Sequence, residues 1–319
     1  MREGKFLQSN IEKWKSIQED GAAGPDELAT QFTELVNDLG YAKTFYPKSQ
    51  VTVYLNGLAS SKYLSIYSNK KEETSRLRRF FVIELPLVVR KHHQMLFYSL
   101  LVFVVFALIA VFSSAQDQEF VRGVLGNQYV EMTEENIAKG DPFGVYKQEG
   151  ELYMFLAIAL NNIRVAFNMF VAGFFAGIGT VYMLFKNGVM LGSFQYFFFA
   201  KGLGWESILV IWIHGALEIS AIVIAGGAGL VVGRSLLFPG TYTHLQSLRM
   251  GVKDGLKIMI GLVPVFLCAA FFEGYITRHT GMPLWLSLFI LIGSFSFIGW
   301  YFIYYPIRLA KNIQLEKQV

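Results

Sequence analysis

The chain has 319 residues, of which 53% are hydrophobic and only 16% carry a charge. A soluble globular domain usually has about 25% charged residues, so this composition excludes an ordinary soluble domain and indicates a membrane protein. The net charge of +4 is small and fits the basic flanks of membrane spans. We therefore expect a lipid bilayer, and no nucleic acid, as a partner.

Residues 1–92 are predicted to form a cytosolic, amphipathic helical region. Apolar residues recur at helical spacing in two stretches, which end at Trp14 and at Leu39. The sequence "GPDEL" at 24–28 is typical of a helix start, with proline in the first turn and acidic residues favoured by the helix dipole. The basic stretch 76–93, "RLRRFFVIELPLVVRKHH", is expected to run along the membrane surface into the first span.

The first transmembrane helix is predicted over 93–113, because residues 95–112 carry no charge and are long enough to cross a bilayer. The polar segment 114–151 is predicted to be an acidic extracytoplasmic loop. Residues 113–151 contain eight Asp or Glu but only three Lys or Arg. Since basic residues precede the span and acidic residues follow it, the positive-inside rule places the N-terminus in the cytoplasm.

A glycine-rich transmembrane core is predicted over 152–308, followed by a cytosolic tail at 309–319. The uncharged stretch 165–185 is predicted to be the second span, which would return the chain to the inner surface at Lys186. The twelve residues 189–200 would extend about 18 Å as a helix, against about 30 Å of hydrocarbon. They therefore predict a half-helix, or a span that ends in a cavity.

Lys186 and Asn187 are predicted to lie at a helix end on the inner surface, or at the mouth of a broken helix. Further spans are predicted around 211–233, 256–276 and 283–305. The expected fold class is all-α, a polytopic helical membrane protein with about six membrane elements, one of them short or broken. Both termini are expected in the cytoplasm.

The segment 211–233 is almost wholly apolar, yet it carries His214 and Glu218 one helical turn apart. Glu218 precedes Arg234 by sixteen residues, or about 24 Å of helix, so it is expected in the outer half of the bilayer. Arg164 is expected at a similar depth. An ionised carboxylate in hydrocarbon costs about 2.5 kcal/mol or more, which predicts an Arg164–Glu218 ion pair. The predicted buried polar cluster consists of Asn161, Asn162, Arg164, Asn168, His214 and Glu218.

This cluster has a structural and a functional interpretation. In the structural interpretation, its polar groups hydrogen-bond to one another and fix the register of the helices. In the functional interpretation, they line a cavity for an ion, a proton or a small polar substrate. A metal site is the third alternative, but only His214 and Glu218 offer ligands, and His244 and His279 are assigned to loops. No metal and no other cofactor is predicted. Neither G-x-S-x-G nor H-E-x-x-H occurs, which argues against a hydrolase, and a non-enzymatic protein is expected.

Pairs of glycines with four-residue spacing form a second pattern. Small residues let helices approach closely in a bilayer, where the hydrophobic effect does not drive helices together. Close packing within the chain is the first interpretation, and a homodimer through one glycine face is the alternative. The predicted helix-packing pairs are Gly173 with Gly177, Gly188 with Gly192, and Gly229 with Gly233.

With these segments in view, the chain resembles the stage II sporulation protein M family of bacterial integral membrane proteins over nearly its whole length. The resemblance rests on "YPKSQVTVYLNGL", "FFVIELPLVVR", "NNIRVAFNMFVAGFFAGIGTVYMLFKNGVMLG", "HGALEISAIVIAGGAGL" and "FPGTYT". The pieces "NNIRVA", "KNGVMLG" and "HG-x-x-E" are its most specific parts. The resemblance implies a location in the bacterial cytoplasmic membrane.

In the founding setting of the family, the protein resembles a scaffold that recruits peptidoglycan-remodelling partners at the engulfment septum. The resemblance therefore implies a non-enzymatic scaffold of a membrane-associated complex, which contacts other membrane or cytosolic proteins through residues 1–92. The alternative is a transporter or channel for an ion or a small polar solute, because a short helix beside buried polar groups is typical of transporters. A polar cavity that reaches His214 or Glu218 would favour the alternative.

Overall fold

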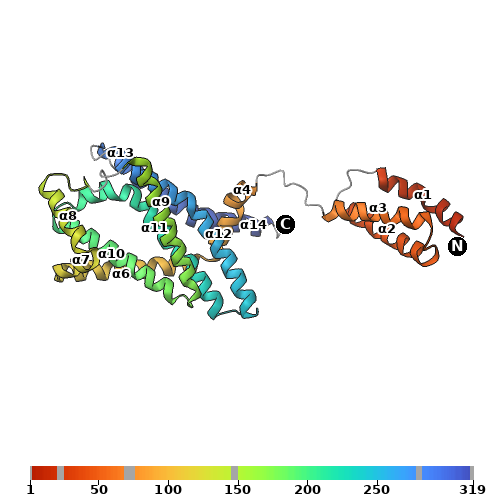
Figure 1. The fold of residues 1–319 in the computed structure, drawn as a ribbon, viewed down its shortest axis with the longest axis horizontal. Helices are drawn as coiled ribbons and strands as arrows, with labels where there is room; N and C mark the ends of the chain where they lie inside the picture. Colours follow the sequence, from red (N-terminus) through yellow and green to blue (C-terminus); the bar gives the residue numbers. More distant parts are fainter. Residues whose placement is uncertain (1, 20–24, 68–75, 145–149, 278–281, 317–319) are drawn as a thin grey trace. The chain divides into compact units, whose positions relative to one another are not determined.

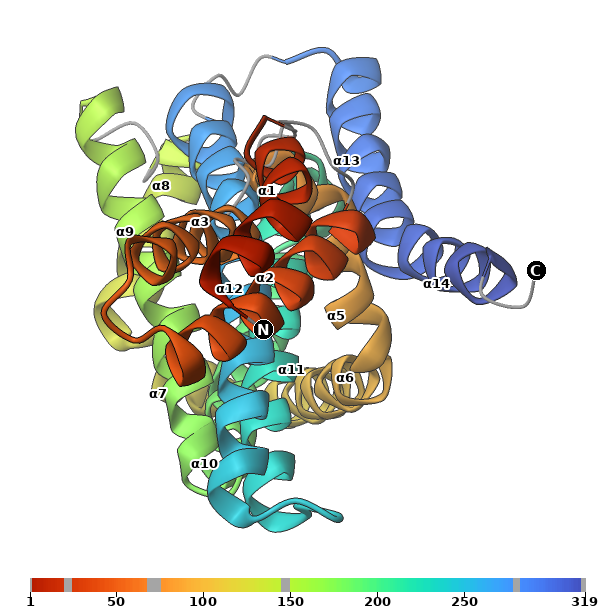
Figure 2. The same cartoon turned by 90° about the vertical axis from the view of Figure 1, so that its right-hand side faces the viewer.

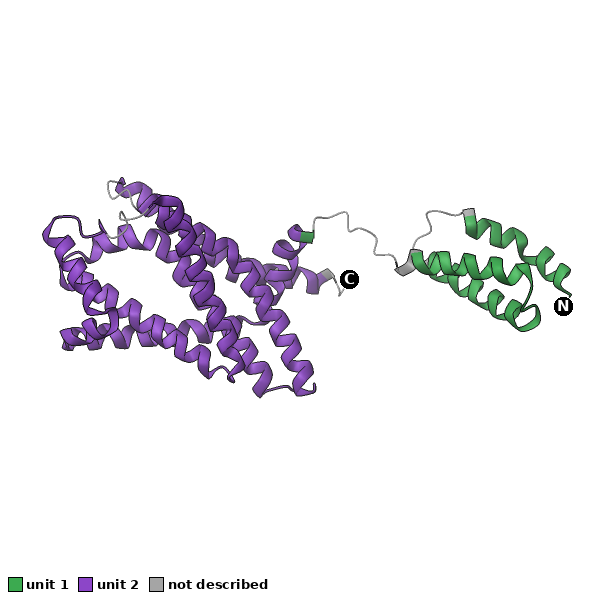
Figure 3. Ribbon diagram, in the orientation of Figure 1, with its two compact units in different colours: residues 1–76 green, residues 77–319 purple. Residues whose placement is uncertain are grey.

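The computed structural model describes a helical chain in two compact units, and its described residues contain no strand (Figures 1 and 3). The first unit is Met1–Arg76 and the second is Leu77–Val319. The described residues are 2–19, 25–67, 76–144, 150–277 and 282–316.

The first unit consists of three helices around their own core. They are α1 (Glu3–Glu19), α2 (Pro25–Phe45) and α3 (Gln50–Tyr67). Trp14 is fully buried in the core, and its indole nitrogen donates a hydrogen bond of 2.8 Å to Asp38. Lys13 forms an ion pair with the same carboxylate. The aromatic anchor is therefore buried with its polar atom satisfied, as a stable small core requires.

The boundary between the units lies at Arg76 rather than at residue 92, where the sequence had placed it. The basic stretch after Arg76 folds onto the second unit. Leu85 is fully buried and packs against Gly261, and the Tyr301 hydroxyl donates to the backbone carbonyl of Phe81 over 2.7 Å. This stretch forms α4 (Arg76–Arg79), the π-helix η1 (Phe80–Glu84) and α5 (Leu85–Lys91).

Long apolar helices make up the second unit. Five helical stretches in the described residues are long and apolar enough to cross a membrane, which confirms the all-α polytopic fold class. α10 is not among the five, but it packs along α6 for much of its length, and with it the membrane elements number about six. The six are α6 (His93–Gln116), α9 (Glu151–Val171), α10 (Ile178–Ala200), α11 (Gly204–Leu237), α12 (His244–Phe271) and α13 (Leu284–Gly299).

The prediction of a second span over 165–185 is wrong, because the chain turns in the middle of that stretch. α9 ends at Val171, and a short 3-10 turn, η3 (Ala172–Phe174), follows it. Gly177 then adopts a left-handed conformation with φ of 80°, which favours glycine. Residues 189–200 accordingly form the second half of α10 rather than a separate half-helix.

The last two α-helices, α13 and α14, lie at the right-hand side of Figure 2. α12 continues into the π-helix η4 (Phe272–Thr277). Pro283 is the N-cap of α13, as expected of a proline at a helix start. α13 continues through the π-helix η5 (Trp300–Tyr304) into α14 (Tyr305–Glu316), and the two α-helices differ in direction.

Glycines bring α6, α9, α10 and α11 into backbone contact within the chain. A Cβ atom at Gly173 would lie 2.2 Å from the carbonyl oxygen of Gly229, and one at Gly233 would lie 2.5 Å from the amide nitrogen of Gly177. Gly188 and Gly192 lie against the backbone of α6 in the same way. These pairs are occupied by contacts inside the chain, so a homodimer would need another surface.

We expect Gly192→Ala to destabilise the folded protein by about 1–3 kcal/mol, because the new methyl group would lie 2.2 Å from the carbonyl oxygen of Ala107. The measurement is thermal unfolding of the purified protein in detergent. Gly293→Ala is the matched control, since nothing lies within 4 Å of its added Cβ atom. Equal unfolding temperatures for the two variants would contradict the packing role of Gly192.

Candidate functional site

A cavity of about 590 Å³ lies between α9, α10 and α11. The helices α7 (Gln118–Leu125) and α8 (Asn127–Ala138) supply part of its wall, through Leu125 and Tyr129 among others. Most of the lining is apolar. The polar part of the wall is built from Asn161, Asn162, His214, Glu218 and Glu273. This combination of an apolar cavity with a few convergent polar groups is typical of a small-solute site.

His214 is held in one orientation by a short chain of hydrogen bonds. Its Nδ1 lies 3.1 Å from the hydroxyl oxygen of Thr277, and that hydroxyl donates to the carbonyl of Phe272. Because a hydroxyl has one proton to donate, it must accept from Nδ1–H. In the neutral ring, the proton therefore resides on Nδ1, and Nε2 is the nitrogen with a lone pair.

The other imidazole nitrogen faces a carboxylate. His214 Nε2 lies 3.9 Å from Oε2 of Glu273. One potential ligand atom each from His214, Glu218 and Glu273 lies within 4.8 Å of the other two. Glu273 belongs to the π-helix η4, and single π-turns within longer helices are frequent at functional sites. The site therefore joins the middle of α11 to the turn that ends α12.

The structure brings part of the predicted cluster together. Asn161, Asn162, His214 and Glu218 all line the cavity, and Asn161 donates a long hydrogen bond of 3.4 Å to the Asn162 side chain. Asn162 and His214 are buried, whereas Asn161 is exposed at the cavity wall.

Arg164 and Asn168 do not join this cluster. Both side chains are exposed on α9, and Arg164 forms no ion pair with Glu218 in the part of the chain that the structure describes. The predicted Arg164–Glu218 ion pair is therefore not formed. The physical reason is the orientation of α9 about its axis: Arg164 and Asn168 lie on its exposed side, whereas Asn162 lies on its buried side in the cavity wall.

Lys186 and Asn187 also lie elsewhere than predicted. They are in the first half of α10 and not at a helix end. Lys186 is exposed, and the Asn187 amide donates to the carbonyl of Met183 one turn earlier. The sequence "NG" therefore does not end a helix here, because the chain turns at Gly177 instead. Of the two loop histidines, His244 begins α12 and His279 lies outside the described residues.

Sequence reasoning missed Glu273 and Thr277. The stretch "CAAFFEGYIT" holds one acidic residue in an otherwise apolar run, which is the same signal that singled out Glu218. Antiparallel packing of the helices would then have paired the two. His214 faces Thr277, and four residues further along α11 Glu218 lies beside Glu273.

A hydrogen-bonded wall supports the cavity where α10 and α11 meet. The Trp212 indole donates to the Gln195 side chain over 2.8 Å, and the Gln195 amide donates to the Ser207 hydroxyl over 2.9 Å. Ser207 in turn donates to the carbonyl of Gly204. The polar side-chain atoms of Trp212, Gln195 and Ser207 therefore all have hydrogen-bond partners, as buried polar groups require.

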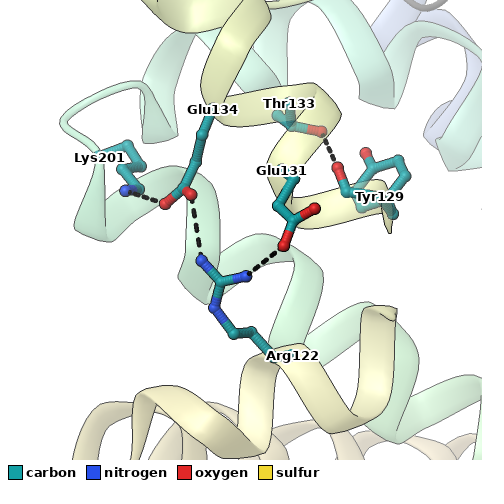
Figure 4. Close-up of polar contacts among 6 residues, drawn as sticks. All are labelled: Arg122, Tyr129, Glu131, Thr133, Glu134 and Lys201. Atoms are coloured by element: carbon teal, nitrogen blue, oxygen red, sulfur yellow. Dashed lines mark hydrogen bonds and ion pairs between the residues drawn. The ribbon is translucent and has the colours of Figure 1, made fainter. Parts of the chain in front are cut away.

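An ion network ties the helices α7 and α8 to the end of α10 (Figure 4). Glu134 accepts a hydrogen bond of 2.6 Å from Lys201 and a second of 3.2 Å from Arg122. Arg122 also approaches Glu131 to 3.6 Å. The backbone carbonyl of Tyr129 accepts from the Thr133 hydroxyl within α8. Because Tyr129 lines the cavity, the network holds one wall of the cavity in place.

Two comparisons with protein-family models give matches. Residues 99–278 match the model of stage II sporulation protein M, which is more than half of the chain. The chain belongs to the stage II sporulation protein M family. The matched region contains every residue of the polar cavity wall.

Residues 4–68 match the model of a domain of unknown function, DUF8413, and coincide with the three helices of the first unit. No curated protein and no solved structure matches the chain. Family membership and the apolar helices together make the chain a multi-pass membrane protein.

The ion network of this family member should respond to acid. The pKa of Glu134 lies below its ordinary value, chiefly because Lys201 donates a hydrogen bond to the carboxylate. Stabilisation from the ionised group is therefore complete above the pKa of the unfolded chain, and it is lost as pH falls through the lower pKa of the folded state. We expect Glu134→Gln to speed amide hydrogen exchange in α7 and α8 at neutral pH.

The Glu135→Gln variant is the control, because Glu135 is far more exposed and forms an ion pair with Lys139 at the C-cap of the same helix. Under acid conditions, where Glu134 is protonated, the Glu134→Gln variant and the unmodified protein should exchange alike. A difference between them that persists unchanged in acid would contradict the ionic basis of this contact.

Proposed function

We propose that the membrane unit binds a small cation or polar solute in the cavity and moves it across the membrane. The single observation behind this proposal is the cavity itself, which reaches both His214 and Glu218. The proposed protein is a non-enzymatic transporter or channel. This is the functional interpretation of the polar cluster, in place of the scaffold that the resemblance alone implied.

The polar groups of the cavity support a solute site rather than a purely structural polar cluster. In a purely structural cluster, each buried polar group has a hydrogen-bond partner, because an unpaired one costs free energy. The Asn162 side chain is 5% exposed, yet its amide nitrogen makes no hydrogen bond of normal geometry, although it lies near the Glu218 carboxylate. Glu218 and Glu273 lie close together, and no Lys or Arg is among the described residues that line the cavity.

An irregular helix in the cavity wall also supports the proposal. Glu273 lines the cavity and lies on a π-helical turn at the end of α12. Irregular backbone at membrane depth occurs where it lines a cavity, and substrate sites of transporters are often built from such elements.

The proposed location is the bacterial inner membrane, with both termini in the cytoplasm. Basic residues follow α11 and precede α6, and the acidic segment 113–151 follows α6. By the positive-inside rule, Arg234 marks the cytoplasmic end of α11. Glu218 then lies about 24 Å from that end, and Glu273 lies the same sixteen residues beyond Lys257 on α12. The site would open toward the extracytoplasmic half.

The second candidate function is a scaffold, and the first unit favours it. The helices α1 to α3 pack around their own core and match a separate family model. Such an appended domain is suited to holding a cytosolic or membrane partner near the transmembrane unit. The two functions are compatible in one chain, because they use different units.

Reconstituted protein should carry a cation flux that depends on the two carboxylates. We expect Glu218→Gln and Glu273→Gln to reduce flux at least about 10-fold, since each removes a charge that would compensate a cation. The measurement is uptake into proteoliposomes, tested separately with H⁺, Na⁺, K⁺, Mn²⁺ and Zn²⁺ gradients.

Glu206→Gln is the matched control, because it removes one carboxylate from an exposed position on α11, more than two turns before His214. This variant should transport as the unmodified protein does. If proteoliposomes with folded protein took up none of the five cations faster than empty ones, cation transport by this cavity would be excluded.

The scaffold function predicts that partners are lost when residues 1–76 are removed. The deletion should stop at Arg76, because residues 77–92 pack on the membrane unit and their loss would damage it. The measurement is a pull-down from detergent-solubilised membranes, with and without the first unit, followed by identification of the retained proteins. Retention of the same partners by both proteins would contradict a docking role for the first unit.

A further inference from the structure

We infer that His214, Glu218 and Glu273 form a binding site for a divalent first-row transition-metal cation. The inference narrows the solute of the proposed function to one class of ion, and it rests on that function only for movement of the ion. Binding is a separate property with its own measurement. The sequence predicted no metal because only His214 and Glu218 were recognised as ligands. In the structure, Glu273 supplies the third ligand.

The orientation of His214 suits a metal ligand. Metal-bound histidine usually donates its other ring N–H to an oxygen atom, which fixes the tautomer and the direction of the ring. Here Nδ1–H donates to the Thr277 hydroxyl, which is itself anchored on the carbonyl of Phe272. The lone pair on Nε2 is then on the side of the Glu273 carboxylate.

Charge balance favours a divalent ion. With both carboxylates ionised and the imidazole neutral, the group carries two negative charges in a largely apolar setting. No Lys or Arg among the described cavity-lining residues compensates them. A monovalent cation would leave one charge uncompensated, whereas a divalent cation makes the site neutral.

The donor set selects among divalent ions. Mg²⁺ and Ca²⁺ prefer sites made of oxygen ligands alone, whereas Mn²⁺, Fe²⁺ and Zn²⁺ accept imidazole nitrogen together with carboxylate oxygen. Bonds of about 2.1 Å in a tetrahedral site place donor atoms about 3.4 Å apart. The three donors lie within 4.8 Å of one another, so side-chain movements of about 1 Å would close the site.

Asn162 provides a further indication of a ligand. Its side chain is buried in the same cavity wall, beside Glu218, and its amide nitrogen makes no hydrogen bond of normal geometry, although it lies near the Glu218 carboxylate. A water molecule carried by a metal ion, or a reoriented carboxylate, would give this nitrogen its acceptor. The cavity also has room for metal-bound water, because its volume is about 590 Å³.

The test is a titration of the full-length, detergent-solubilised protein with Mn²⁺ and with Zn²⁺, followed by calorimetry. We expect one ion per chain, with a dissociation constant raised about 10-fold or more by Glu273→Gln and by Glu218→Gln. Glu206→Gln should bind as the unmodified protein does. Absence of binding by the unmodified protein, or unchanged affinity in both cluster variants, would overturn the site.

Pulsed electron paramagnetic resonance of the Mn²⁺-loaded, unmodified protein tests the histidine ligand without any substitution. Magnetic coupling to one imidazole nitrogen supports the site, and its absence overturns it even where the glutamine variants fail to fold. Titrations with Mg²⁺ and Ca²⁺ test the choice of ion. Affinities equal to that for Mn²⁺ would contradict a site that binds through an imidazole nitrogen and two carboxylates.

Binding and transport can fail separately. Metal binding without Mn²⁺ or Zn²⁺ uptake into proteoliposomes would support the site and refute the transport function. Uptake of H⁺, Na⁺ or K⁺ that depends on Glu218, without metal binding, would support transport and overturn the metal site.

Discussion

The close antiparallel contact of α11 with α12 and its continuation η4 brings together three of the five polar residues of the cavity wall, His214, Glu218 and Glu273. α11 can approach its neighbours because glycines replace side chains where backbones meet. Gly229 lies against α9, and Gly255 of α12 lies against Phe170 and the backbone of α11. With the helices at this separation, His214 reaches Thr277, and Glu218 lies beside Glu273. A wider separation would break the hydrogen bond between His214 and Thr277 inside the apolar core, which costs free energy.

Carboxylates at the two ends of the second unit pair with basic residues, whereas those in the cavity wall have no Lys or Arg beside them among the described residues. Near α5, Asp254 accepts from both Lys91 and His92, and Glu84 pairs with Lys257. At the other end, Glu134 pairs with Arg122 and Lys201. The cavity carboxylates have no such cation among the described residues of the wall. Fixed basic residues therefore hold the structure together at the ends, while the described lining of the cavity offers its carboxylates no Lys or Arg.

The sequence predicted the helical membrane class, the family and four of the five polar residues of the cavity wall, but not Glu273, which completes the wall. Composition and apolar run length determine whether a segment enters a bilayer, and both are local properties. The turn at Gly177 is not visible in hydropathy, because an apolar run of 165–185 is equally consistent with an uninterrupted span. The predicted Arg164–Glu218 ion pair is not formed because hydropathy does not determine which face of α9 meets the core, and Arg164 lies on the exposed face. Glu273 requires knowledge of which helix faces α11, and only tertiary contacts provide it.

The position of α8 links the surface ion network to the cavity. Tyr129 lines the cavity, the Thr133 hydroxyl bonds to its carbonyl one turn later, and Glu134 connects the same turn to Lys201 at the end of α10. α8 cannot move away from α10 without breaking the Glu134 contacts and withdrawing Tyr129 from the wall. Access to His214 and Glu218 from this end is therefore coupled to an ion network that lies outside the apolar spans, where water, salt and pH act directly on it.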